Sequence, residues 1–365
     1  MEHYLDNAAT TAVCDKAAEA AIYAMKVAYG NPSSTHTKGR EAKKLYEKSR
    51  ESIAKALGCQ KNELVFTSCG SESDNWAIIN GAESMKRKGM HVITSSVEHD
   101  AVRKSFDELE KRGFEVTRLS PDSTGKILPE SVLGALRDDT VFISLMLVNN
   151  ETGAVTDISA ISKAVKLRCP DVLIHTDAVQ AFMKIPFKAK SLGADMISIS
   201  GHKVHAPKGI GALYIRDGIK LKPFIVGGEQ ESGRRAGTEA LPNIAAFAAA
   251  VEDYTPAEDL KQYLISLLPE GCTYIDTEAP HILNISLPGY KSEVLMNYLE
   301  AKEIYVSKSS ACKQGKRSHV LEACGLDSRT IDGAIRIGLS RFTAKTDIDA
   351  FIDALTEAKA SLRHL

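Results

Sequence analysis

The chain has 365 residues, of which 44% are hydrophobic and 25% are charged, a composition typical of a globular protein with a large core. This length alone suggests about two domains. The 46 basic and 47 acidic residues leave a formal net charge of −1, without the basic excess of a protein that binds nucleic acid directly. One basic cluster departs from this balance and is interpreted equally well as a solvated loop or as a surface for an acidic partner: Lys308, Lys313, Lys316 and Arg317.

Targeting and ligand patterns narrow the class of protein further. The opening Met-Glu-His-Tyr lacks the cationic and apolar parts of a signal peptide, and no stretch approaches the length of a membrane span, so we expect a cytoplasmic protein without membrane contact. Seven cysteines without a Cys-x-x-Cys pair argue against a zinc site and a disulfide framework. His202 and His205 have no thiol or carboxylate nearby in sequence, so we predict no metal. Gly209-Ile-Gly211 fails as a dinucleotide fingerprint, because Tyr214 replaces the third glycine.

Helical and strand patterns alternate through the first two-thirds of the chain. We expect helices over Lys38–Leu57 and Ser71–Arg87. The expected strands are Leu64–Thr67, His91–Ser95, Glu115–Leu119, Val141–Val148, Val172–Asp177, Ala194–Ser200 and Gly211–Ile215. This order predicts an α/β fold with a mainly parallel central sheet covered by helices.

The pattern changes after about Tyr254 to a shorter α+β unit. Strands are expected over His281–Leu287 and Ala334–Ser340, with Asp347–Leu362 as a closing helix. We therefore predict a large domain over residues 12–254 and a smaller C-terminal domain over residues 255–365, joined by the N-terminal segment 1–11. The boundary is expected to hold to within about ten residues.

Lys203 lies where the chain leaves the buried run Ala194–Ser200, the usual place for ligands in open α/β folds. An amine there can form a Schiff base with an aldehyde cofactor, and an upstream carboxylate can hold a pyridinium nitrogen protonated. Asp177 ends another apolar run and fits the second role. The pair suggests pyridoxal phosphate (PLP), although a lysine and an aspartate at this spacing also occur as a simple ion pair.

Three further segments carry side chains suited to chemistry. Cys69–Asn75 lies between a strand and a helix, where free N–H groups bind an anion, although a serine-rich helix cap is the plainer interpretation. His99 precedes a helical stretch, a position at which a lone histidine is more often structural. Arg336 lies inside an apolar run, so it needs a carboxylate partner, either from a ligand or in an internal salt bridge.

Together these motifs resemble the cysteine desulfurases of the NifS/IscS type, which are PLP enzymes of the class V aminotransferase family and of PLP-dependent transferase fold type I. The resemblance runs from Tyr4 to about Phe342. It rests on Tyr4–Thr11, Asn31–Ser34, Phe66–Asn75, Val97–His99, Val148–Glu151, His175–Gln180, Ser200–Lys203, Arg235–Thr238 and Ser309–Cys312.

The resemblance implies a role for each matching residue. The implied cofactor contacts are Lys203 to the aldehyde, Asp177 to the ring nitrogen, Gln180 to the phenolic oxygen, His99 stacked on the ring, and Gly70, Ser71, Ser200 and His202 on the phosphate. Thr238 would reach the phosphate of the other subunit of a homodimer. Asn149 and Arg336 would clamp the substrate carboxylate, while His99 assists proton transfer.

Cys312 separates this chain from ordinary aminotransferases, because sulfur abstraction needs a second nucleophile. Lys308 and Lys313 would favour its thiolate. The resemblance thus implies conversion of L-cysteine to L-alanine, with sulfur held on Cys312 as a persulfide for an acceptor protein in iron–sulfur cluster assembly or tRNA thiolation. A selenocysteine lyase or a small-amino-acid aminotransferase of the same fold is the alternative enzyme, and a sulfur-carrier scaffold without turnover is the alternative outside enzymes.

Three features depart from the family pattern. Relatives commonly have glycine where Cys69 stands, so Cys69 could be a second thiol near the cofactor. The loop after Cys312 is shorter than in relatives with a long mobile loop, which leaves acceptor specificity open. The segment Ala245–Gly271, which carries a long interdomain helix in relatives, is also shortened.

Overall fold

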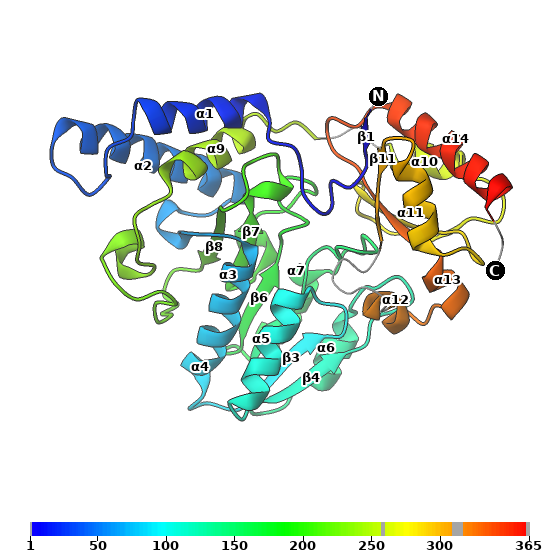
Figure 1. Ribbon diagram of the computed structural model, residues 1–365. Helices are drawn as coiled ribbons and strands as arrows, with labels where there is room; N and C mark the ends of the chain where they lie inside the picture. The colour runs from blue at the N-terminus through cyan, green and yellow to red at the C-terminus, as the bar shows by residue number, and fades with distance from the viewer. Residues whose placement is uncertain (1, 257–259, 309–316, 363–365) are drawn as a thin grey trace.

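The computed structural model describes residues 2–256, 260–308 and 317–362. Two lobes are visible in Figure 1: a large one with a central sheet between helices, and a smaller one formed mostly by the C-terminal third of the chain. This arrangement confirms the expected α/β class with a smaller α+β unit.

The central sheet of the large lobe has seven strands in the order β2-β8-β7-β6-β5-β3-β4. Strands β4, β3, β5, β6 and β7 run parallel, whereas β8 is antiparallel to both β7 and β2. The sheet is therefore mainly parallel, as predicted. The strand bounds are β2 Leu64–Thr67, β3 His91–Ser95, β4 Glu115–Leu119, β5 Thr140–Ser144, β6 Leu173–Asp177, β7 Met196–Ser200 and β8 Gly211–Ile215.

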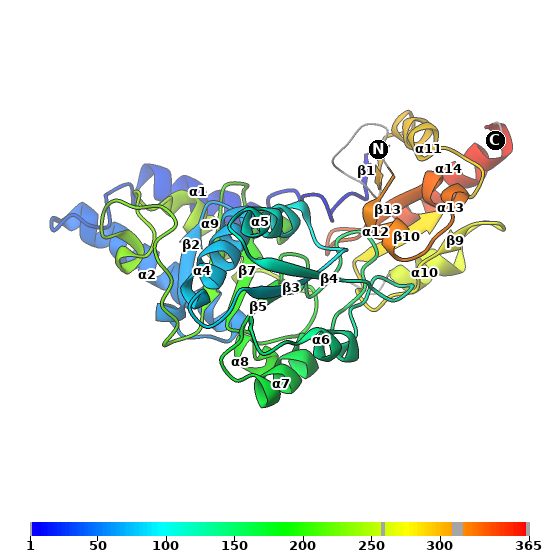
Figure 2. The ribbon, with the colours of Figure 1, turned by 90° about the horizontal axis from the view of Figure 1, so that it is seen from below.

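Both faces of this sheet are covered, since every residue of six strands is buried and alternate residues point to opposite sides, while the edge strand β4 is partly exposed. One face packs on α5 through residues such as Phe142 and Met196, and the other packs on α7 through residues such as Ile143 and Ile197. Figure 2 shows α4 and α5 on one side of the strands and α6 to α8 on the other. The helices of the two faces are α3 Gly70–Asn75, a π-helical turn Trp76–Asn80, α4 Gly81–Met85, α5 Asp100–Lys111, α6 Pro129–Ala135, α7 Ile158–Arg168 and α8 Ala189–Leu192.

Three more helices pack against one another at the end of the large lobe: α1 Asp15–Lys26, α2 Thr37–Leu57 and α9 Leu241–Glu252. Capping contacts at both ends define where α2 begins and ends. His36 accepts a hydrogen bond from the Gly39 N–H, and Gly58 closes the helix in the left-handed conformation at φ 76°. Short 3-10 turns occupy Lys61–Glu63, Gly201–Lys203 and Gln230–Gly233.

The smaller lobe contains a four-stranded antiparallel sheet in the order β12-β13-β10-β9. The N-terminal segment begins in this lobe, because β1 (His3–Tyr4) pairs in parallel with β11 (Ile304–Tyr305), and it then crosses to the large lobe. The other bounds are β9 Thr273–Tyr274, β10 Ile282–Ser286, β12 Ser307–Lys308, β13 Ala334–Gly338, α10 Lys261–Ser266, α11 Ser292–Glu300, α12 His319–Ala323, α13 Ser328–Asp332 and α14 Lys345–Ser361.

Two element predictions need correction. The strand expected over 141–148 ends at Ser144. Leu145 and Leu147 still donate to the carbonyl oxygens of His175 and Asp177 in β6, but the Leu145 carbonyl accepts from the Thr176 hydroxyl, so the regular ladder stops. The helix expected over 71–87 begins at Gly70 and contains the π-helical turn at Trp76–Asn80. The domain limits of 12–254 and 255–365 stay a prediction; α9 ends at Glu252 and α10 begins at Lys261.

Candidate active site

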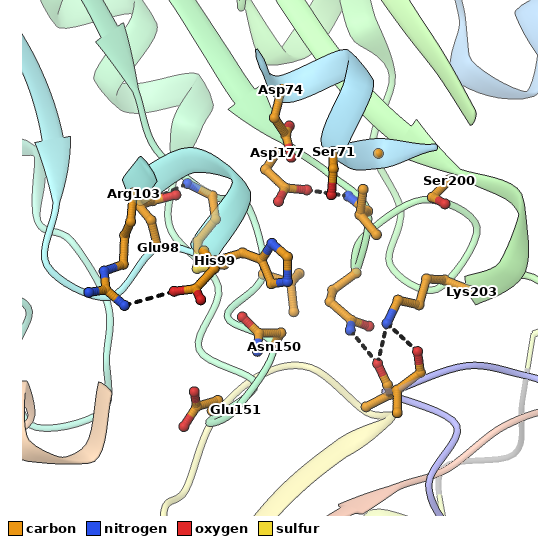
Figure 3. A pocket seen from close by; sticks show the side chains of 18 of the residues that line it. Ser71, Asp74, Glu98, His99, Arg103, Asn150, Glu151, Asp177, Ser200 and Lys203 are labelled. Carbon is orange, nitrogen blue, oxygen red and sulfur yellow. Dashed lines mark hydrogen bonds and ion pairs between the residues drawn. The ribbon is translucent and has the colours of Figure 1, made fainter. Parts of the chain in front are cut away.

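A cavity of about 500 Å³ lies at the carboxyl ends of the parallel strands, with residues of the N-terminal segment and the smaller lobe closing it (Figure 3). Ligands of open α/β sheets commonly bind at this edge. The lining residues are Ala8, Ala9, Cys69, Gly70, Ser71, Asp74, Glu98, His99, Asp100, Arg103, Met146, Val148, Asn150, Glu151, Asp177, Val179, Gln180, Ser200, His202, Lys203, Arg317, His319 and Arg336.

Lys203 follows β7, in the 3-10 turn Gly201–Lys203. Its Nζ donates hydrogen bonds to the carbonyl oxygens of Ala8 and Ala9, each at 2.6 Å. Burial and, to a lesser extent, the nearby Arg336 lower the pKa of Lys203 to about 7, although Asp6 and Asp177 oppose the change. A large fraction of this amine is therefore uncharged, and so nucleophilic, near neutral pH.

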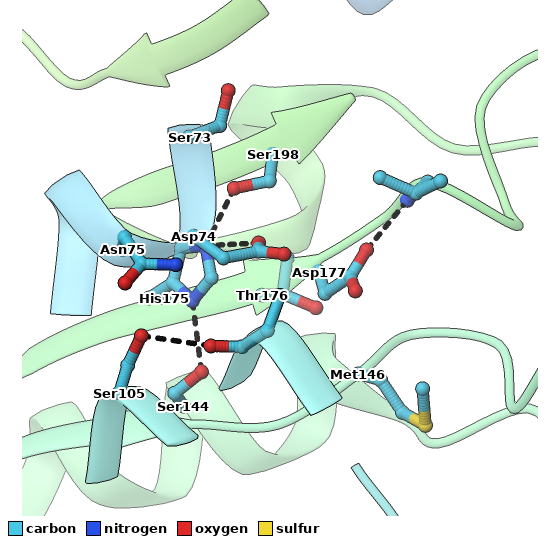
Figure 4. Close-up of polar contacts among 12 residues, drawn as sticks. Ser73, Asp74, Asn75, Ser105, Ser144, Met146, His175, Thr176, Asp177 and Ser198 are labelled. Atoms are coloured by element: carbon cyan, nitrogen blue, oxygen red, sulfur yellow. Dashed lines mark hydrogen bonds and ion pairs between the residues drawn. The ribbon is translucent and has the colours of Figure 1, made fainter. Parts of the chain in front are cut away.

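Asp177 ends β6 and is buried, with its Oδ1 accepting a hydrogen bond from the Val179 N–H at 2.8 Å. Burial raises the pKa of Asp177, whereas the Val179 N–H, His99 and Lys203 lower it. A second carboxyl, Asp74 of α3, lines the same cavity, and Figure 4 shows the two side chains close together. The sequence interpretation missed Asp74 as a site residue.

Asp74 is only 2% exposed, and its Oδ1 has no hydrogen-bond partner. Burial and the neighbouring Asp177 raise the pKa of Asp74 well above its usual range. His175 does not supply a positive charge, because burial lowers its pKa to about 3 while Ser144 and Ser198 hold its two ring nitrogens at 2.8 and 2.9 Å. Burial and the neighbouring carboxyl thus favour a proton on Asp74, whereas His99 and Lys203 favour the charged form of Asp177.

An anion cup lies between β2 and α3, opposite the end of β7. Gly70 and Ser71 begin α3, where the first N–H groups of a helix have no intrahelical acceptor. The Ser200 hydroxyl is buried without a hydrogen-bond partner. Burial lowers the pKa of His202 to about 4, and its Nδ1 lies 3.1 Å from the Thr10 hydroxyl. Gly70 is required here, since a Cβ at this position would lie 2.8 Å from a Val179 methyl group.

His99 and Glu98 form another wall of the cavity. The His99 Nδ1 accepts a hydrogen bond from the Ala101 N–H at 3.2 Å, so this ring caps α5. Glu98 is buried, and its Oε1 accepts hydrogen bonds from the Ser95 hydroxyl and the Met146 N–H at 2.5 and 3.2 Å. Burial raises the pKa of Glu98 to about 8, so this carboxyl is mostly neutral at pH 7.

Arg336 lies on β13 and reaches the cavity from the smaller lobe with 3% of its side chain exposed. Its guanidinium donates to the Asn150 carbonyl oxygen at 2.8 Å and to Asp6 Oδ1 at 3.2 Å, while Nε has no partner. Both interpretations of the sequence therefore apply: an internal ion pair exists, and the same guanidinium faces the cavity.

The structure does not bring Asn149 to the cavity. Its Oδ1 accepts hydrogen bonds from the N–H groups of Glu151 and Thr152 at 2.9 and 3.0 Å, and its Nδ2 donates to the Val97 carbonyl. The neighbouring Asn150 lines the cavity instead, because the Asn149 side chain points into the turn and holds the N–H groups of the residues that follow.

Two other predicted site residues lie elsewhere. Thr238 is exposed, on the segment after the 3-10 turn Gln230–Gly233, and does not line this cavity. Cys312 lies outside the described residues, as does the loop that follows it as far as Lys316. Cys69 lines the cavity at the start of α3.

The residues present fit PLP. Lys203 offers an amine for its aldehyde, Asp177 a buried carboxylate for its ring nitrogen, and the anion cup with the unpartnered Ser200 hydroxyl a place for its phosphate. Gln180 lines the cavity and donates from Nε2 to the Ala8 carbonyl at 2.8 Å. Within the described ranges, no three His, Cys, Asp or Glu side chains gather to hold a metal ion.

Comparison with known proteins places the chain in a family. The profile of the class-V aminotransferases matches residues 3–351, so the chain belongs to that family. A "Cysteine desulfurase IscS" from Methanosarcina thermophila is 40% identical over 377 aligned residues, covering 99% of this chain and 93% of the relative. Within the family, the chain belongs to the cysteine desulfurases of the NifS/IscS type.

Solved structures agree with the fold. A NifS-like protein superposes with a TM-score of 0.93 at 37% identity, covering 99% of this chain and 100% of the other. SspA, solved in complex with cysteine, gives a TM-score of 0.85 at 34% identity, covering 94% of this chain and all of the other. Among the described helices, none is long and apolar enough to cross a membrane.

Proposed function

We propose that the protein is a PLP-dependent cysteine desulfurase that converts L-cysteine to L-alanine and places the sulfur on its own Cys312 as a persulfide. The observation that carries the proposal is the convergence of Lys203, Asp177, the anion cup and Arg336 on one cavity. Its 40% identity to a cysteine desulfurase supports the same activity. When bound, PLP supplies an electron sink that stabilises negative charge at the substrate Cα.

The chain's own groups hold this cofactor. The Lys203 amine would attach its aldehyde, and the Asp177 carboxylate would hold its ring nitrogen protonated. Gln180 would donate to its phenolic oxygen, and His99 would stack on its ring. Gly70, Ser71, Ser200 and His202 would bind its phosphate through N–H and hydroxyl groups and a ring N–H.

Arg336 binds the substrate carboxylate. Its buried guanidinium has an unpartnered Nε and only one carboxylate contact, at 3.2 Å from Asp6, so it retains capacity for an anion. The Asn150 side chain lines the same part of the wall and is the proposed second contact, whereas Asn149 holds the turn that carries it.

Lys203 and His99 move the protons. The lysine amine, with its pKa near 7, accepts the proton from the substrate Cα once it is free of the aldehyde. His99 lines the cavity next to the mostly neutral Glu98 and exchanges the proton of the substrate thiol.

Cys312 is the proposed nucleophile toward the substrate sulfur. Support comes from its flanks: Ser307 pairs with Arg336 in the sheet of the smaller lobe, and Arg317 lines the cavity. In the transfer, the Cys312 thiolate attacks the substrate sulfur, the C–S bond breaks, and its electron pair stays with the carbon that becomes the alanine methyl group. That carbon then gains a proton.

The proposal includes a cytoplasmic homodimer that passes sulfur to an acceptor protein, for iron–sulfur assembly or tRNA thiolation. Exposed apolar side chains on α1 and in residues 224–226 support a subunit interface. Ala236, near Thr238, donates its N–H to the Ile225 carbonyl, so the apolar segment and the predicted contact to the partner's phosphate belong to one surface.

The test compares alanine release from L-cysteine with transamination. Wild-type enzyme with cysteine and no reductant is expected to gain one sulfur atom on the peptide that holds Cys312, by mass spectrometry. Cys312→Ala should retain PLP and lose alanine release by several orders of magnitude, about the loss typical for a covalent nucleophile. Cys272→Ala is the matched control and should keep full activity. A persulfide on Cys69, or full turnover by Cys312→Ala, would contradict the proposal, as would keto acid as the main product.

A further inference from the structure

A second, smaller cavity lies behind Lys203, between the large lobe and the sheet of the smaller lobe. Its volume is about 90 Å³. Lys203 lines both cavities, and the other polar groups used below are Lys184, which follows β6, and His281, which precedes β10. A space of this size holds roughly three water molecules, at about 30 Å³ each, so it is too small for a second organic substrate.

His281 marks this space as a site that needs a ligand. The residue is 4% exposed, and neither ring nitrogen has a hydrogen-bond partner in the described structure. The Gln180 backbone comes close enough to raise the pKa of His281, against the larger lowering by burial, but this contact falls short of the geometry of a full hydrogen bond. Because an imidazole always carries at least one N–H, a buried unpartnered ring is costly unless something in the cavity accepts from it.

The side chains that line the cavity indicate that this ligand carries a negative charge. Lys184 and Lys203 both line the cavity, and no acidic side chain occurs among its described lining residues. The Lys184 ammonium has one hydrogen-bond acceptor, Gln180 Oε1 at 3.1 Å. Burial lowers the pKa of Lys184 well below its ordinary value, and Lys203 and Arg336 lower it further. Water can satisfy the hydrogen bonds here, whereas an anion would also stabilise the charged form of the buried Lys184 amine, for which the described lining offers no carboxylate.

We propose that this cavity binds a small monovalent inorganic anion of halide size, held by the Lys184 ammonium and the His281 ring N–H. One halide with one or two water molecules fills the volume. Since Lys203 borders the same space, a bound anion favours its charged form. Given the proposed role of Lys203 as the base, the anion would act as a brake on proton abstraction without occupying the substrate cavity.

The first test uses bromide as the probe. Crystals of the PLP-loaded enzyme are soaked in sodium bromide, and the anomalous signal of bromine is mapped. The expected result is a peak within about 3.5 Å of Lys184 Nζ and of a His281 ring nitrogen. Lys184→Met should lose the peak, whereas Lys163→Met, an exposed lysine on α7, should keep it. A wild-type cavity that holds only water, or a peak that survives in Lys184→Met, would overturn the proposal.

The second test asks whether binding also occurs in solution. Thermal unfolding of the PLP-loaded enzyme is compared in sodium bromide and in sodium gluconate, whose anion is too large for the cavity, at equal ionic strength. Bromide is expected to raise Tm by about 2 °C in the wild type and in Lys163→Met, and to have no such effect in Lys184→Met. Equal Tm values for the wild type in the two salts would mean that the anion binds at crystal concentration only, and would refute the site. Neither readout depends on turnover, so failure of the desulfurase proposal would leave the anion test intact.

Discussion

At the scale of single residues, buried side chains decide the chemistry of the site by where their protons lie. Asp74, Asp177 and Glu98 are all nearly inaccessible to solvent, yet only Asp177 has cationic neighbours that favour its charged form. Of these three carboxyls, Asp74 and Glu98 therefore favour the neutral form, whereas nearby cations favour the carboxylate of Asp177; Asp100 and Glu151 line the cavity as well.

Exchanging the two aspartates for asparagine should separate their roles. Asp74→Asn keeps a neutral group of the same shape, so we expect bound PLP and desulfurase activity within about threefold of wild type. Asp177→Asn removes the charge opposite the ring nitrogen and should lower kcat by at least about a hundredfold. The measurements are the absorption spectrum of the cofactor and alanine release. Equal losses in the two variants would show that the proton assignment is wrong.

Glu98 should make the stability of the fold depend on pH. Its pKa is raised to about 8 in the folded protein, whereas the unfolded value is about 4.3. The folded state then binds the extra proton between these values, so the contribution of Glu98 is fully present below about pH 4 and is lost as the pH rises through 8, by about 5 kcal/mol in all.

The check is denaturant unfolding of wild type and Glu98→Gln across this pH range. The free energy of unfolding of the wild type should fall with pH relative to that of Glu98→Gln. Glu300→Gln, which changes an exposed carboxylate, should follow the wild type. Parallel curves for wild type and Glu98→Gln would contradict the raised pKa.

At the scale of elements, two neighbouring residues of the Val148–Glu151 turn have different roles, one structural and one at the cavity. Asn149 satisfies two backbone N–H groups and Asn150 faces the cavity. Asn149→Ala should lower the free energy of unfolding by about 2–3 kcal/mol, because buried donors lose their acceptor. Asn150→Ala should leave stability nearly unchanged and raise KM for cysteine. Chemical denaturation and steady-state kinetics of both variants test the division; a stable Asn149→Ala with a raised KM would reverse it.

The strand β13 carries the other substrate contact. Arg336→Ala should lower kcat/KM for cysteine by about a hundredfold or more, mostly through KM, while PLP remains bound. Arg329→Ala, an exposed arginine on α13, is the control. If KM and kcat both stayed at wild-type values, the guanidinium would serve only its pair with Asp6.

The elements of the large lobe could be predicted well from sequence, because a parallel sheet buried on both faces leaves long apolar runs that end at definite residues. Leu64–Thr67, His91–Ser95 and Gly211–Ile215 form strands with the expected bounds. The run at 141–148 was longer than its strand, since burial and single hydrogen bonds to β6 continue after Ser144, where the regular ladder ends. An apolar run in the sequence indicates which residues are buried. It does not by itself show which of them form strand hydrogen bonds.

The site was only partly predictable. Residues at strand ends, such as Lys203 and Asp177, could be placed because the fold fixes that edge. Asp74 and Asn150 were missed because nothing local tells which side of a short helix or turn faces the ligand. The position of Glu98 beside His99 was available as a signal, and a buried carboxyl next to a histidine deserves weight as a site residue.

At the scale of the whole molecule, the exposed apolar surface predicts self-association. Val226 is 81% exposed and lies beside other exposed apolar residues at 224–225, whereas the equally exposed Leu167, at 80%, stands on α7 away from that cluster. Val226→Asp should shift the protein from dimer to monomer in analytical ultracentrifugation, and Leu167→Asp should not. A monomeric wild type, or a Val226→Asp variant that remains dimeric, would argue against this interface.

The pairing of β1 with β11 sets the order in which the protein can be completed. His3 and Tyr4 are made some 300 residues before their partners Ile304 and Tyr305, about 15–60 s earlier at ordinary translation rates. Until then the segment that presents the Ala8 and Ala9 carbonyls to Lys203 lacks its anchor. The ribosome-bound chain can form its large sheet before its finished pocket, so the cofactor is expected to load only after Tyr305 has been made.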